Sequence, residues 1–95
     1  MTITLQKESL NYYILSSLSI QDLYGAQILQ NVASYINIHQ TDLYAALINL
    51  ESEGMITREY TQQDDLHYNL CSITPLGRDY IKSFIKELDR RLARR

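Results

Sequence analysis

The sequence has little of the residues that mark disulfide-bonded, fibrous or disordered proteins. Its 95 residues include one cysteine, one proline, three glycines and no tryptophan. The single cysteine, Cys71, cannot form a disulfide within the chain, which agrees with a reducing compartment. With 45% hydrophobic and 21% charged residues, the composition is that of a globular protein, and the length is that of one domain.

Long hydrophobic runs are also missing. Each apolar stretch is interrupted by a charged or amide residue well before the roughly 20 residues that a membrane-spanning helix needs. The first residues, Met1–Glu8, contain no apolar core flanked by positive charge, so we expect no signal peptide. We therefore expect a cytoplasmic protein that has no membrane partner.

The patterns that catalysis and metal binding require are absent. His39, His67 and Cys71 lack a ligand spacing such as Cys-x-x-Cys or His-x-x-x-His, so we expect no metal site and no cofactor. The sequence has no glycine-rich phosphate loop, no nucleophile with a plausible base and no carboxylate pair on an apolar background. It therefore predicts a protein that is not an enzyme.

Positive charge is scarce in residues 1–74, which we call the head. The head contains two Lys or Arg, Lys7 and Arg58, against eight Asp or Glu, a net charge of −6. Residues 75–95 contain seven Lys or Arg against three Asp or Glu, a net charge of +4. The net charge of −2 for the whole chain hides this division. Any partner of the head has to be bound without a strong positive field.

The spacing of apolar residues predicts three helices in the first half of the chain. We expect them over residues 5–18, 22–34 and 40–53, with Asp22 as the N-cap of the second. Gly54 closes the third helix in the left-handed conformation that glycine adopts without strain. The residues expected to face the core are Leu10, Tyr13, Ile14, Leu18, Tyr24, Ile28, Leu29, Val32, Leu43, Ala46, Leu47 and Leu50.

After Gly54 the apolar pattern changes. Residues 55–60 and 67–73 are rich in β-branched and aromatic residues, and they predict a β-hairpin with a polar turn between its strands. Thr74 followed by Pro75 predicts the start of a last helix, with Thr as N-cap and Pro at the first position. The predicted fold class is therefore mainly α with a small β-hairpin.

The last helix carries an apolar seam with heptad-like spacing. Four of its members recur at steps of four, three and four, and two aromatic residues lie beside them. The six are Ile81, Ile85, Leu88, Leu92, Tyr80 and Phe84. Such a seam packs either on the head of its own chain or on the same seam of a second copy. Because the domain is small and the seam is long, we expect it to form a dimer interface.

Four segments of the chain resemble the PadR-like family of transcriptional regulators. Leu23–Ile28 (LYGAQI) resembles the segment that opens the family's second helix, and Thr41–Leu47 (TDLYAAL) looks like its recognition-helix motif, GTLYPAL. Leu50–Ile56 (LESEGMI) is similar to the family's LEEEGLI stretch, and Ile73–Arg78 (ITPLGR) to its ITPEGR turn. The four lie in family order over about residues 10–90, so together they are far more specific than any one of them.

The resemblance implies a winged helix-turn-helix domain in residues 1–74 and a dimerisation helix in residues 75–95, within a single compact domain. It implies a homodimeric regulator, usually a repressor, that binds a palindromic operator in DNA. The third helix would enter the major groove while the wing, the hairpin with its tip at residues 62–67, would touch the backbone. The DNA-binding residues that we expect are Gln40, Thr41, Tyr44, Ala45, Ile48, Asn49, Arg58, His67 and Arg78.

The chain departs from the family pattern at charged positions. The family commonly has arginines where this chain has Ile48 and Asn49, and its wing is often basic where this one contains Asp64 and Asp65. Since Lys and Arg supply most non-specific affinity for DNA, a second function stays open. It is an acidic winged-helix module that binds a basic protein, as an antagonist or adaptor, and does not bind DNA. The eight tyrosines also leave open an aromatic ligand cavity.

Overall fold

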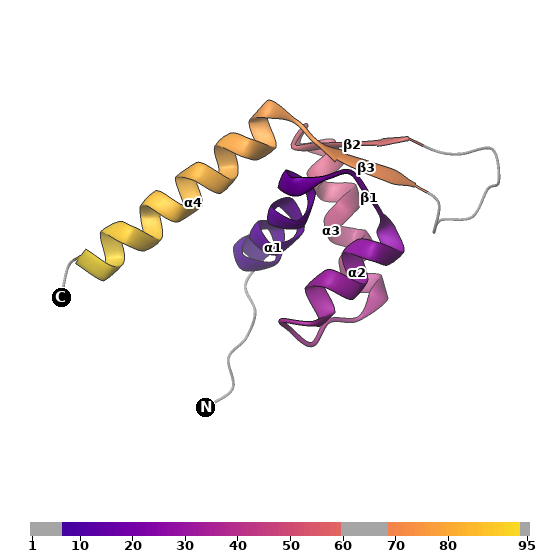
Figure 1. Cartoon of the computed structure of the whole chain (residues 1–95), viewed down its shortest axis with the longest axis horizontal. Helices are drawn as coiled ribbons and strands as arrows, with labels where there is room; N and C mark the ends of the chain where they lie inside the picture. The colour runs from indigo at the N-terminus through magenta and orange to yellow at the C-terminus, as the bar shows by residue number, and fades with distance from the viewer. Residues whose placement is uncertain (1–6, 60–68, 94–95) are drawn as a thin grey trace.

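The computed structural model describes residues 7–59 and 69–93. The elements, in chain order, are α1 (Lys7–Ile20), β1 (Leu23–Tyr24), α2 (Gly25–Ala33), α3 (Gln40–Ser52), β2 (Ile56–Glu59), β3 (Leu70–Ile73) and α4 (Pro75–Ala93). The first three helices and a small sheet form one body, from which α4 projects (Figure 1). The predicted fold class, mainly α with a small β component and a long last helix, is confirmed.

The second helix begins later than the sequence predicted. Leu23 and Tyr24 form the short strand β1, in which Leu23 pairs with Cys71 of β3. The N-cap of α2 is Tyr24, whose backbone N–H donates a hydrogen bond to Oε1 of Gln27 over 2.9 Å. The predicted cap at Asp22 is therefore wrong. Tyr24, which we expected in the core, has 37% of its surface exposed because it caps the helix.

The sheet has three antiparallel strands in the order β1-β3-β2. The two predicted hairpin strands form its centre and one edge, and their pairing runs from Ile56 opposite Ile73 to Glu59 opposite Leu70. The strand β1 adds the other edge. The predicted turn between the hairpin strands, and the wing residue His67, lie outside the described residues.

The core lies between the helices and one face of the sheet. Apolar residues with at most 7% of their surface exposed come from every element except α4: Ile14, Leu15, Leu18, Leu23, Ile28, Val32, Leu43, Ala46, Leu47, Leu50, Ile56 and Cys71. All four core positions predicted for α3 are confirmed. Each large apolar side chain buried in this way contributes about 1.5–3 kcal/mol to folding. In the part of the chain that is described, no helix is long and apolar enough to cross a lipid bilayer.

The start of α4 is fixed by hydrogen bonds to the segment that follows α3. The Thr74 hydroxyl donates to the Gly54 carbonyl over 2.6 Å and accepts from the Gly77 N–H over 3.2 Å. The Thr74 N–H donates to the Met55 carbonyl over 3.0 Å. The predicted N-cap at Thr74, with Pro75 as the first helical residue, is confirmed. Gly54 has a φ of 78°, so the predicted left-handed glycine after α3 is confirmed as well.

Gly77 allows α4 to approach this segment closely. A Cβ at residue 77 would collide with the Met55 carbonyl oxygen and lie 2.8 Å from Cγ1 of Ile73. We expect Gly77→Ala to lower the free energy of unfolding by about 2 kcal/mol or more, because backbone atoms cannot move aside cheaply. Urea denaturation measures this change. The control Ser83→Ala, exposed in the same helix, should change the free energy by less than about 0.5 kcal/mol. Equal stability of Gly77→Ala and the wild type would contradict the packing argument.

Candidate nucleic-acid interface

The helices α2 and α3 form a helix-turn-helix, joined by residues 34–39. Ile28 and Val32 anchor α2 in the shared core. At the start of α2, Gly25 lies against the ring of Tyr44 in α3, where a Cβ on residue 25 would be 2.9 Å from Cε1 of Tyr44. The missing side chain of Gly25 therefore lets Tyr44 fill the space between the two helices, which leaves Tyr44 half-buried.

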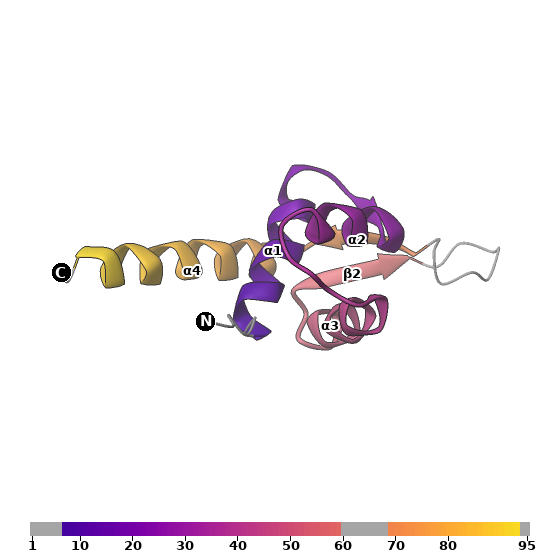
Figure 2. The same cartoon turned by 90° about the horizontal axis from the view of Figure 1, so that it is seen from below.

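One face of α3 is turned away from the core, and Figure 2 shows this helix on one side of the body. We define this outer face of α3 as Thr41, Ala45, Ile48 and Ser52, which follow one another at steps of four, three and four. All four are exposed and uncharged. The exposed fraction of Ile48 is 53%, which makes it the most exposed large apolar residue of α3. The outer face thus offers methyl and hydroxyl groups, and no charge, to a partner.

The residues of α3 predicted to bind DNA lie on this face or at its margins, with one exception. Thr41, Ala45 and Ile48 belong to the outer face, and Gln40 and Asn49 are exposed beside it. The exception is Tyr44, whose ring packs on Gly25. The helix-turn-helix therefore brings five of the six predicted residues to one exposed surface, with the sixth holding α3 against α2.

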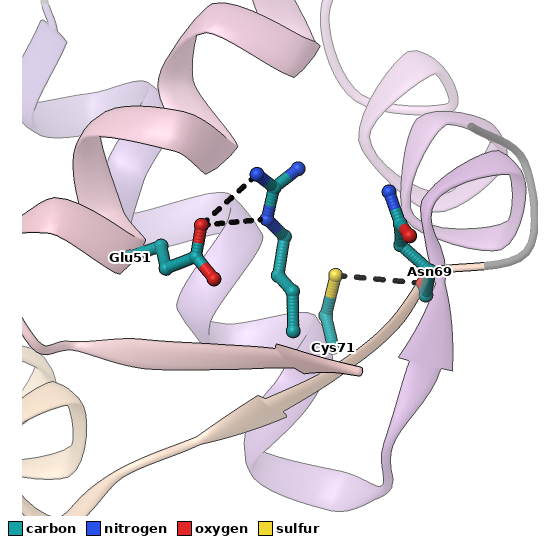
Figure 3. Close-up of polar contacts among 4 residues, drawn as sticks. Glu51, Asn69 and Cys71 are labelled. Atoms are coloured by element: carbon teal, nitrogen blue, oxygen red, sulfur yellow. Dashed lines mark hydrogen bonds and ion pairs between the residues drawn. The ribbon is translucent and has the colours of Figure 1, made fainter. Parts of the chain in front are cut away.

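Arg58 has a different environment from the one predicted. Its Nε and Nη2 donate to Oε1 of Glu51 in α3, over 3.1 and 2.9 Å, and its side chain is only 8% exposed. The Glu51 carboxylate receives both bonds in Figure 3. The guanidinium faces α3, and because only 8% of the side chain is exposed, little of it is available to a DNA phosphate. The geometry favours a structural role for Arg58, which ties β2 to α3.

Arg78 lies at the start of α4, next to the end of α1. Its Nη1 donates to the Ser19 carbonyl over 3.4 Å, and its side chain is exposed. The last turn of α1 contains no basic residue, so Arg78 supplies positive charge to the negative end of that helix. It remains accessible to a phosphate. His67, the wing residue predicted to bind DNA, lies outside the described residues.

The predicted dimer residues divide into two groups along α4. Tyr80 and Ile81 pack against the core, and the ring of Phe84 stacks on Tyr12 of α1 with centroids 4.6 Å apart. We call the other three the distal seam, and their exposed fractions are 43%, 42% and 62% for Ile85, Leu88 and Leu92. Both views show the end of α4 clear of the rest of the described chain (Figure 1, Figure 2). The first group packs on the chain's own head, whereas the distal seam stays exposed among residues 7–59 and 69–93.

The positive charge of the described residues lies mostly on α4. The helix α3 contains no Lys or Arg, and its first turn contains Asp42. Near the end of α4, Arg90 and Arg91 approach the Glu87 carboxylate at 3.4 and 3.5 Å. These pairs are exposed and contribute little to stability. The outer face of α3 therefore has no Lys or Arg on the same helix that could bind a phosphate.

Cys71 is fully buried beside the Arg58–Glu51 pair. It lies opposite Arg58 in the pairing of β2 with β3, and its thiol points from the sheet toward the helices (Figure 3). Burial raises the pKa of the thiol from its ordinary 9.0 to about 11, although the positive charge of Arg58 acts in the opposite direction. The thiol is therefore protonated and shielded at neutral pH, which is unsuited to redox sensing.

Comparison with known proteins agrees with this architecture. Residues 14–83 match the model of the transcriptional regulator PadR-like family. The chain belongs to the PadR-like family. A transcriptional regulator from Clostridium thermocellum is 30% identical, with 88% of this chain and 84% of that one covered and a TM-score of 0.77. No curated protein matches the chain.

Two further solved structures share the fold of this PadR-like chain. A PadR family regulator from Clostridium difficile is 22% identical, with 88% of this chain and 97% of that one covered and a TM-score of 0.66. Bacillus subtilis PadR, solved in complex with operator DNA, is 23% identical, with 80% of this chain and 46% of that one covered and a TM-score of 0.69. Membership of a family of transcriptional regulators confirms two predictions, the resemblance and the absence of an enzymatic function.

The environment of Cys71 makes its reactivity a measure of folding. Because the thiolate is the reactive form, a pKa of about 11 in place of 9.0 lowers the thiolate fraction about a hundredfold at pH 8. We expect a disulfide reagent to modify the native protein at least a hundred times more slowly than the urea-unfolded protein, as followed by absorbance. The Cys71→Ala variant should give no signal in either state. Equal rates in the folded and unfolded states would contradict the buried environment.

The raised pKa of Cys71 also predicts how the stability of the protein changes with pH. Because the folded thiol holds its proton more tightly than the unfolded one, the contribution is fully present below pH 9 and is lost as the pH rises to about 11. We expect the wild type to lose more stability than Cys71→Ala between pH 8.5 and roughly 10.5, measured by urea denaturation. A parallel dependence on pH in the two proteins would contradict this assignment.

Proposed function

We propose that this PadR-like protein is a homodimeric DNA-binding regulator that represses transcription by occupying a palindromic operator. The observation that carries the proposal is the exposed outer face of α3 on the second helix of a helix-turn-helix. In such a motif this helix lies in the major groove. The complex of Bacillus subtilis PadR with operator DNA, on the same fold, supports the assignment.

We assign the contacts with DNA to two groups of residues. Thr41, Ala45 and Ile48, with Gln40 and Asn49 at the margins of the outer face, would meet base edges. Arg78 and the wing residue His67 would meet the phosphate backbone. Tyr44 is placed by its contact with Gly25 and would set the angle of α3 in the groove. Arg58 is left out, since its guanidinium is paired with Glu51.

The dimer would form through the distal seam of α4. Its three side chains are apolar, lie on one side of a helix and are exposed in the part of the protomer that the structure describes. Between 42% and 62% of each side chain is still exposed. Covering that remainder contributes about 1 kcal/mol for each side chain, which favours pairing with an identical seam. In this division of labour, residues 1–74 form the DNA-reading head and residues 75–95 the dimerisation helix, within one compact domain. The pairing would hold two α3 helices at the spacing of half-sites, about 34–36 Å apart.

The alternative of an acidic module that binds a protein and not DNA is not favoured. Membership of a family of transcriptional regulators argues against it. The outer face of α3 also carries no acidic residue, although the head as a whole is negative. A cytoplasmic location is part of the proposal, because a repressor has to reach its operator DNA.

A single charged residue placed in the distal seam tests whether this seam forms the dimer interface. We expect Leu88→Glu to convert a dimer into a monomer of 11.1 kDa in sedimentation velocity at micromolar concentration. The circular dichroism of the variant should stay that of a folded protein, because Leu88 is 42% exposed and supports no core contact. Lys86→Glu, exposed on the same helix outside the seam, is the control and should remain dimeric. A dimer that survives in Leu88→Glu would place the interface elsewhere.

The scarcity of cations in the head predicts a weak dependence of DNA binding on salt. If each protomer neutralises about two phosphates, one of them through Arg78, the logarithm of the affinity falls with the logarithm of the salt concentration with a slope of about −4 for the dimer. Fluorescence anisotropy with a duplex enriched from a random pool measures the slope. A slope of about −8 or steeper would contradict the conclusion that the protein contacts phosphates with only a few cations. If no duplex is enriched or retarded even at low salt, the proposal of DNA binding fails.

Charge in the wing should change that slope. We expect the double variant Asp64→Lys and Asp65→Lys to bind the same duplex more tightly and to steepen the slope, because it adds phosphate contacts at the wing. The control is the double variant Glu87→Lys and Asp89→Lys, which makes the same change in net charge on α4, away from Arg78. Equal effects of the two variants would show that overall charge acts, and that the wing makes no phosphate contact.

A further inference from the structure

We infer that the outer face of α3 reads the methyl groups of thymine, so that the operator half-site consists of A·T pairs where this face meets it. The inference rests on the proposed function and adds the base composition that the protein selects.

The outer face presents methyl groups to whatever it meets. Thr41, Ala45 and Ile48 each end in at least one methyl group, and all three are exposed on consecutive turns of α3. The Ile48 side chain, 53% exposed, lies between Ala45 and the exposed hydroxyl of Ser52 along this face. Its aliphatic surface would lose contact with water in a major groove, and the loss favours an apolar partner.

Thymine supplies that partner. Its C5-methyl group is an apolar feature that a base edge displays in the major groove, and alanine, threonine methyl and other apolar side chains pack on it. Guanine is most often recognised by Arg or Lys, through its O6 and N7. Because α3 contains neither residue, guanine would lack its commonest partner on this helix.

The margins of the outer face select the complementary base. Gln40 and Asn49 are exposed beside it, and an amide side chain pairs with N6 and N7 of adenine. Cytosine is read by Asp or Glu. The acidic residue of the first turn, Asp42, lines a hollow together with Ala45, Asn49 and Leu10 of α1, so it borders the outer face on the side of Asn49. Asp42 would therefore meet a cytosine only at that margin, outside the positions that the methyl groups cover. Methyl groups at the centre and amides at the margins therefore both favour A·T pairs.

Two measurements on the full chain test the inference. The first is selection of duplexes from a random pool, after which the bound sequences are read. We expect at least two adjacent A·T pairs in each half-site where α3 lies in the groove. If no sequence is enriched, the proposed function fails. If sequences are enriched but guanine or cytosine fills these positions, the proposed function stands and the inference is overturned.

The second measurement removes thymine methyl groups from the selected duplex. Deoxyuridine in place of thymidine deletes one methyl group and keeps every hydrogen-bonding group of the base. We expect the affinity to fall about fourfold for each thymine that Ile48 covers. In Ile48→Ala the difference between thymine and uracil should shrink to less than about twofold, since the partner of the methyl group is missing.

Ile20→Ala is the matched control, because Ile20 is 85% exposed at the end of α1, away from α3. This variant should keep the full difference between thymine and uracil. Equal binding of the two duplexes by the wild type would overturn the inference, and so would an undiminished difference in Ile48→Ala.

Discussion

The junction between the end of α3 and the start of α4 is the constraint on which the rest of the structure depends. The Thr74 hydroxyl donates a hydrogen bond to the Gly54 carbonyl just after α3 and accepts one from the Gly77 N–H in α4. The Thr74 backbone bonds Met55, whose carbonyl also leaves no room for a Cβ at residue 77. The last turn of one helix and the first turn of the other therefore share a few fixed atoms, and the angle between them is set by short-range geometry.

This junction connects the two surfaces that the proposed function uses. The outer face of α3 would meet DNA, and the distal seam of α4 would meet a second protomer. Since the two helices are held at one angle, the symmetry of a dimer would fix where its two α3 helices lie. The Arg58–Glu51 pair braces the same end of α3 against β2, so the wing strands and the reading helix form one unit. The positive charge of Arg58 stabilises the fold in this pair, so it is less available to bind a DNA phosphate.

Much of this arrangement could be predicted from the sequence, because it depends on local patterns. The core face of α3, the left-handed Gly54 and the cap at Thr74 each follow from spacing or from the conformational preference of a single residue. The strand β1 could not be predicted, because two residues are too few to show alternation. For the same reason the prediction of Asp22 as the cap of α2 is wrong.

The roles of Arg58 and of the α4 seam depend on contacts between distant residues. Arg58 looked like a cation available to DNA because nothing in the sequence reveals that Glu51, on the preceding helix, lies within hydrogen-bonding distance. The seam of α4 is regular from Ile81 to Leu92, yet the structure divides it where Phe84 meets Tyr12. Periodicity shows that a helix face is apolar, and only packing shows what covers it.

Because Phe84 stacks on Tyr12, a small tilt of α4 at this contact is amplified along the part of the helix that lies beyond it. Beyond residue 84 the helix continues to Leu92, about 12 Å farther along its axis at 1.5 Å per residue. A tilt of about 10° at the stacked rings would move the far end by about 2 Å, comparable to the width of a side-chain contact. In a dimer joined through that end, the spacing of the two heads would therefore depend on the stacked rings of Phe84 and Tyr12 as well as on the junction at Thr74.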